Sequence, residues 1–351
     1  MTLPGYEAQR IEAMQWAYSV KKQSDYDTVV LDADLTQSHP IREVSIGQIT
    51  KELRSDRETI GKGHEYATSV REVARDTRFT RAFDGSSDIL GWLFAFGCGK
   101  VQSTQQGVST AYLHKFTLFD PAVEATSQLP VTTIVEKITG ATALKRALVS
   151  MAVTGITVSA EGFEHLSVSA DFIGAGRAVA STLTMPGLVA ASYLSSNEAV
   201  VKLGDAEEAI STRVRSWSVA LANNPKEGRG YFPSSGLYRG RLEVGARTVI
   251  PSLVVDLAAD SDLLDDFLAN TEIALDILCE GDVISGTYKH SIRFVFPDLQ
   301  YQAVLIEEDE GMLTYALSFD ENTVLYDSNS TDPPVKVEVV NTIPAYLEAS
   351  A

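Results

Sequence analysis

Strict alternation of apolar and polar side chains in two short segments constrains the fold most. Residues 166–172 read Leu-Ser-Val-Ser-Ala-Asp-Phe, and residues 313–320 read Leu-Thr-Tyr-Ala-Leu-Ser-Phe-Asp. A period of two places successive side chains on opposite faces of a β-strand, so each segment has one dry and one wet face. An acidic-glycine turn precedes each segment (161–162 and 310–311), and a strand-like run precedes each turn (151–158 and 291–306). The sequence therefore predicts two long β-hairpins.

Two other segments follow a helical pattern. Residues 84–97 and 260–270 each place apolar side chains on one face, after a serine that can cap the first turn. The predicted caps are Ser86 or Ser87 and Ser261, and the predicted terminators are Gly97 and Asn270. Both helices are short, and their similar layout indicates that they are counterparts.

The same order of elements occurs twice along the chain. Each half contains a strand, a polar or Gly/Pro-rich stretch, a second strand, a helix and a hairpin, with a longer connection inside residues 100–135 of the first half. The strands are expected at 43–49 and 67–79 and at 210–222 and 247–257, and the hairpins at 145–172 and 289–319. We expect a first repeat at 28–174 and a second at 208–322. Residues 175–207 are then a linker, and 1–27 and 323–351 are terminal arms.

The charge balance is strongly acidic. The 351 residues include 47 acidic and 29 basic side chains, a net charge of −18. A surface that grips nucleic-acid phosphates needs clustered Lys and Arg, so such a surface is not expected. Solubility alone would also explain the balance. The N-terminus lacks a secretory pattern, and no apolar run reaches the roughly 20 residues that span a bilayer, so we expect synthesis in the cytoplasm and no membrane contact.

No pattern predicts catalysis, a metal site or a cofactor. Cys98 and Cys279 are far apart, and the five histidines occur singly. The segment Gly97-Cys-Gly-Lys100 lacks the remaining residues of a phosphate loop and follows a predicted helix instead of preceding one. The acidic run 307–310 is predicted at a hairpin tip, where such runs are usually solvated. We therefore expect a protein that is not an enzyme.

Several segments, in their order along the chain, resemble the tail tube (major tail) proteins of long-tailed bacteriophages. The resemblance covers roughly residues 40–320 and consists of patterns of residue class, without catalytic signatures. The segments that carry it are Gly61–Thr68, Arg78–Arg81, Ser87–Gly97, His114–Thr117, Leu129–Ile134 and the hairpin 148–172.

The resemblance implies a mainly-β tail-tube fold, a β-sandwich or split barrel with a flanking helix. Its long hairpins would join those of neighbouring subunits into a ring, and rings would stack into a tube in the virion tail through which the genome leaves. It also implies tape-measure, terminator and distal tail proteins as partners, with genomic DNA passing through without specific binding. Because two repeats lie in one chain, we expect a trimeric ring with pseudo-sixfold symmetry in preference to a hexamer.

Two sets of side chains are candidates for these contacts. The wet hairpin faces are candidates for the tube lumen, with contact to outer solvent or to another subunit as equal alternatives. These faces carry Ser167, Ser169, Asp171, Thr314, Ser318 and Asp320. The second hairpin tip is a candidate for contact with the next ring, opposite basic residues of the loop 51–62. It carries Glu307, Glu308, Asp309 and Glu310.

Three other classes of protein fit less well. A tail terminator or distal tail ring protein would share the fold and cap the tube. A two-domain β-sandwich that binds a surface or sugar would expose aromatic clusters on loops, whereas Trp16, Trp92 and Trp217 lie in predicted helix or strand segments. An enzyme ranks third, because it would need a polar pocket that the sequence does not reveal.

Overall fold

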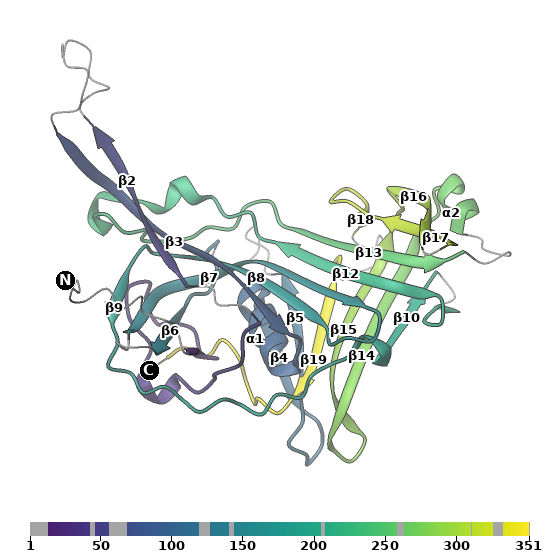
Figure 1. Cartoon of the computed structure of the whole chain (residues 1–351), viewed down its shortest axis with the longest axis horizontal. Helices are drawn as coiled ribbons and strands as arrows, with labels where there is room; N and C mark the ends of the chain where they lie inside the picture. The colour runs from purple at the N-terminus through teal and green to yellow at the C-terminus, as the bar shows by residue number, and fades with distance from the viewer. Residues whose placement is uncertain are drawn as a thin grey trace, which may run out of the picture.

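The computed structural model describes residues 13–42, 46–55, 69–118, 127–139, 144–204, 208–257, 263–309, 311–325 and 333–350. Two antiparallel sheets enclose one central helix, α1, which contacts strands of both (Figure 1). The prediction of a mainly-β fold is confirmed. In the described residues, no helix combines the length and apolar character needed to cross a membrane.

The bounds of the elements are as follows. The larger, eleven-stranded sheet contains β1 (Ala13–Tyr18), β2 (Gln48–Ser55), β3 (Val70–Asp84), β6 (Thr132–Thr139), β7 (Leu144–Glu161), β8 (Ser167–Gly174), β9 (Ala178–Ala180), β12 (Val214–Ala222), β13 (Thr248–Asp256), β16 (Ala303–Asp309) and β17 (Met312–Ser318). The smaller, eight-stranded sheet contains β4 (Gly99–Gln105), β5 (Tyr112–Leu118), β10 (Ala199–Leu203), β11 (Glu208–Ala209), β14 (Ile273–Ser285), β15 (Tyr288–Leu299), β18 (Val324–Leu325) and β19 (Lys336–Asn341). The described α-helices are α1 (Ser87–Cys98) and α2 (Leu263–Ala269).

The larger sheet consists mainly of two groups of four strands placed side by side. Its main path runs β16-β17-β13-β12-β7-β8-β3-β2. The group β7-β8-β3-β2 comes from the first half of the chain and the group β16-β17-β13-β12 from the second. Along the path, each group starts with the two strands of its hairpin. The next strand is the one that leads into the helix in sequence, and the last is the strand before that one in sequence. The groups meet where β12 pairs with β7.

Helix α1 is buried along its whole length between the two sheets. The predicted cap is confirmed, since the Ser86 side chain accepts a hydrogen bond from the Ile89 amide. The predicted terminator was wrong: the helix continues past Gly97, and Gly99 caps it with φ at 83°. Gly97 has a packing role instead. A Cβ there would lie 2.7 Å from Ile156 Cδ1 and 3.1 Å from Leu221 Cδ2, so its absence lets the helix approach the β7–β12 junction.

Both predicted hairpins form, and one of them needs a correction. β7 pairs with β8, and β16 with β17, with glycines at positive φ in the two turns. The run 291–306, predicted as one arm, is two strands in different sheets. β15 pairs with β14 and β19 in the smaller sheet, and the chain then crosses to the larger sheet, where β16 begins at Ala303. The alternating sequence pattern does not reveal this crossing, because a strand has the same side-chain period of two in either sheet.

The segments expected to be arms or a linker contribute strands to the two sheets. β1 pairs with β6, and β10 pairs with β14. β19 lies between β15 and β5 inside the smaller sheet, and the N- and C-terminal segments meet at a bridge between Lys22 and Ala349. Asn270 follows α2 with φ at 56°, as the predicted terminator requires. Ser261, the expected cap, lies outside the described residues, as do 43–45 and 67–68 of two predicted strands.

Candidate functional site

One face of the larger sheet packs on the core, and the other, which we call the open face, carries small polar side chains. A row of five serines crosses it on five neighbouring strands. Ser318 pairs with Ser252, which pairs with Ser218, then Ser159, then Ser167. Serine hydroxyls are small and uncharged, so this row offers no cation to a phosphate backbone.

The structure places most of the predicted wet-face residues on the open face. Ser167, Ser169 and Asp171 alternate along β8 with residues that are buried in the core. Asp171 accepts a hydrogen bond from the Thr80 hydroxyl of β3, and Ser318 belongs to the serine row. The alternation therefore identified the orientation of β8 correctly.

Thr314 and Asp320 have local roles within the chain. Thr314 is only 1% exposed, and its hydroxyl donates to the Glu307 carbonyl oxygen at 3.4 Å. Asp320 follows β17 and fixes a turn, because its carboxylate accepts from the Asn322 amide at 2.8 Å and from the Gln302 side chain at 3.1 Å. Both side chains are therefore held by contacts within one protomer.

The acidic tip of the second hairpin and the loop proposed to face it lie at opposite ends of the larger sheet. Glu307 and Glu308 are exposed on β16, and Asp309 ends that strand, while Glu310 lies outside the described residues. Every strand of the main path runs antiparallel to its neighbour, so the tips after β7 and β16 share one end of the sheet, and the last residue of β2 and the first residue of β3 lie at the other. Of the loop 51–62, residues 56–62 also lie outside the described residues.

Two strands of the main path have one side unpaired within the described protomer. They are β2 and β16, which lie at the two ends of the path and at opposite sides of the molecule (Figure 1). On β16, Leu305 is 53% exposed and Ile306 57% exposed. An apolar, unpaired edge strand is a ready site for pairing with another chain, so proteins normally cover such an edge.

A buried ionic cluster fixes the start of β2. The carboxylate of Glu136, which is fully buried, accepts from Arg81 and from Arg146 Nε at 3.0 Å. It also accepts from the Gly47 amide at 3.1 Å, while Arg146 donates to the Gly47 carbonyl oxygen. Burial lowers the pKa of Arg81 to about 10, which the nearby Glu136 carboxylate opposes, so the guanidinium stays charged at neutral pH. Since Gly47 immediately precedes β2, the cluster holds this edge strand in place.

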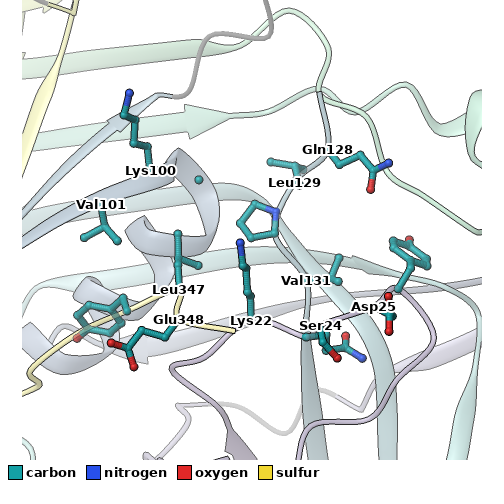
Figure 2. Close-up of a pocket in the computed structure, with 15 residues that line it drawn as sticks. Lys22, Ser24, Asp25, Lys100, Val101, Gln128, Leu129, Val131, Leu347 and Glu348 are labelled. Carbon is teal, nitrogen blue, oxygen red and sulfur yellow. The ribbon is translucent and has the colours of Figure 1, made fainter. Parts of the chain in front are cut away.

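One cavity formed by described residues is lined mostly by uncharged side chains. It measures about 540 Å³ and lies where the N- and C-terminal segments meet β4, with Lys22, Lys100 and Glu348 among its lining residues (Figure 2). Neither cysteine lines it, and burial raises the pKa of the Cys98 and Cys279 thiols to about 12, so both stay protonated. No group of three potential metal ligands occurs within the described ranges.

Sequence reasoning missed three of the five members of the serine row. Ser159, Ser218 and Ser252 lie on β7, β12 and β13, outside the two segments with the clearest alternation. A weaker signal was present, because residues 216–219 read Ser-Trp-Ser-Val and 157–160 read Thr-Val-Ser-Ala. Alternation gives the face of each strand, but it does not give the register that brings these serines into one row.

A family model described as phage tail tube protein matches residues 19–320, most of the chain. No curated protein matches the chain. The matched region includes both four-strand groups, the open face and the two unpaired edge strands. The chain therefore belongs to the phage tail tube protein family and is a structural component of the virion tail.

Proposed function

We propose that three chains close into a ring with pseudo-sixfold symmetry and that rings stack into a conduit for the genome. The observation that carries this proposal is the tandem placement of the two four-strand groups in one sheet. The β12–β7 pairing already joins one group to the next in the way that neighbouring chains would have to join. Six groups from three chains would then form one closed barrel, which removes both unpaired edges. In such a ring the two groups of each chain would act as copies of one duplicated unit.

The open face is the best candidate for the lumen of this barrel. The other face packs on α1, so closure of the sheet with α1 outside would leave the serine row inside. Asp171 and the net charge of −18 would oppose binding of DNA phosphates, so the duplex would pass without being held. Ser167, Ser169 and Ser318 belong to the same proposal.

Stacking would bring opposite ends of neighbouring sheets together. The tip with Glu307, Glu308, Asp309 and Glu310 would then meet the β2–β3 connection of the next ring, whose loop 51–62 contains basic residues. The tape-measure, terminator and distal tail proteins would engage the ends of the tube. A head-to-tail contact of this kind repeats without limit, as a tube requires.

Electron microscopy of the purified protein tests the proposal. At high concentration we expect long tubes, with three chains around each ring when imaged at a resolution that traces the chain. Tubes with six chains per ring would overturn the trimer. Single rings that never elongate would favour the alternative of a terminator or distal tail protein, and a persistent monomer would contradict assembly altogether.

A cysteine on the open face should be sheltered from bulky reagents in assembled tubes. We expect Thr157→Cys, exposed on β7, to react with a small maleimide in tubes but not with a maleimide attached to a large protein. Gln102→Cys, exposed on β4 of the smaller sheet, is the matched control and should react with both. Equal labelling of the two variants by the bulky reagent would place the open face outside. Failure of the small reagent at Thr157→Cys would place it in a contact between subunits.

A further inference from the structure

The chain contains a completed copy of the contact between two four-strand groups. In the β12–β7 pairing, Leu221 lies opposite Ile156 and Ala220 opposite Thr157. Leu221 and Ile156 face the core and are only 2% and 1% exposed. If neighbouring chains join as the two groups do, an inference that rests on the proposed function, this pairing is a template for the contact between chains.

Equivalent positions in the two groups are set by several independent features. Leu166 and Phe172 bound the alternating segment of β8 as Leu313 and Phe319 bound that of β17. The last residues of β3 and β13 are both aspartates that pair with the first alternating polar residue of those segments. Each aspartate also accepts from an arginine Nε, Asp84 from Arg42 at 2.5 Å and Asp256 from Arg215 at 2.7 Å. These matches align β2 with β12 and β16 with β7.

We propose that β2 of one chain pairs antiparallel with β16 of the next chain in the register of the β12–β7 template. The template pair Ala220–Thr157 corresponds to Gln48 of one chain opposite Leu305 of the next. In the same way, the template pair Leu221–Ile156 corresponds to Ile49 opposite Val304. The template pair Ala222–Gly155 corresponds to Thr50 opposite Ala303. The partner is thus a second copy of this chain.

The exposure of side chains on β16 fits this register. Ile306 is 57% exposed, whereas its equivalent Val158, which the β12 template covers, is fully buried. Ile49 and Val304 are each partly exposed in the protomer, and their equivalents are among the most buried residues of the core. Pairing would therefore remove apolar surface from water at the positions where the template does so. Gly47, held by Glu136 and Arg146, fixes the first residue of this contact.

The register also gives the strand tilt that a closed barrel requires. Ser318, at one end of the serine row, pairs with Ala303 on β16, and the row crosses β7 at Ser159. Ala303 and Ser159 therefore lie on the same line across the sheet. The equivalent of Ala303 on β7 is Gly155, four residues before Ser159. A shift of four residues across four strands, at about 3.3 Å per residue and about 4.8 Å per strand, corresponds to a tilt of about 35°. Closed barrels tilt by about 35–45°, so repetition of the template leads to closure.

Oxidative cross-linking tests the register. We expect Gln48→Cys combined with Leu305→Cys to give disulfide-linked chains in assembled protein, because both side chains lie on the open face and opposite one another. The linked ladder should end at the trimer. Gln48→Cys combined with Val304→Cys is the control, since a shift of one residue places the two side chains on opposite faces. The native Cys98 and Cys279 are buried and should give little background.

The outcomes separate the junction from the proposed function. Cross-linking at least tenfold greater in the Gln48/Leu305 variant than in the control supports the proposed register. Equal cross-linking in both, or none in the former while electron microscopy shows rings, overturns the register and leaves the proposed function standing. An absence of rings in the unmodified protein overturns the proposed function itself.

Discussion

Replacing Ile306 by aspartate is expected to shift tube assembly to much higher protein concentrations while leaving the protomer folded. The side chain is 57% exposed in the protomer, so a carboxylate there is solvated and the fold tolerates it. In the proposed ring it would be buried as Val158 is, without a partner of opposite charge. Burying such a group costs at least about 3 kcal/mol per junction, which raises the concentration needed for assembly about 100-fold.

Sedimentation velocity across a concentration series measures this change. Val108→Asp is the matched control, because this fully exposed side chain lies in the β4–β5 turn, away from both edge strands, and should assemble normally. Circular dichroism and denaturant unfolding should not distinguish the two variants. If Ile306→Asp assembled at the concentration of the unmodified protein, β16 would not be part of the ring contact.

Replacing Glu136 by glutamine should lower the free energy of unfolding more than any other substitution proposed for this protein. The carboxylate is completely buried and accepts from Arg81, Arg146 and the Gly47 amide. Glutamine has nearly the same size but no charge, so the fully buried Arg81 guanidinium would lose its counter-ion. Removing one partner of a buried ion pair costs about 3–5 kcal/mol. Because Gly47 precedes β2, assembly should weaken as well.

Denaturant unfolding of the unassembled protein measures the loss. Glu164→Gln serves as the control, because Glu164 is exposed in the turn between β7 and β8 and a change there should stay within about 0.5 kcal/mol. A loss below 1 kcal/mol in Glu136→Gln would mean that water or a rearranged side chain compensates the Arg81 charge.

The sequence predicted those features of the fold that depend on neighbouring residues. Alternation identified the strands β8 and β17 and the wet face of β8, and local capping chemistry identified Ser86 or Ser87 at the start of α1. On β17 the predicted faces were wrong at one end, where Leu313 is exposed and Thr314 is buried. The end of α1 was predicted at Gly97 because glycine usually stops a helix. That glycine is instead required by the approach of β7 and β12, which are distant in sequence, so no local rule reveals its role.

The features that position the candidate site depend on contacts between distant residues. The serine row exists because Ser318 pairs with Ser252 and Ser218 with Ser159, and the register of each pair is set by the whole sheet. The crossing of the chain between the sheets before Ala303 has the same origin. Tandem order was expected from the repeated elements, but which edges stay unpaired emerged only from the strand order.

The stagger of four residues between the two groups also sets the width of the proposed conduit. Three copies of the eight-strand path, with strands about 4.8 Å apart and tilted about 35°, give a backbone circle about 45 Å across. Side chains on the open face narrow this bore to a size that a DNA double helix passes without contacting the wall on all sides. Six chains would double the circle to about 90 Å. Because each chain carries two groups, the calibre of the tube can change only in steps of one whole chain, which adds two groups at a time.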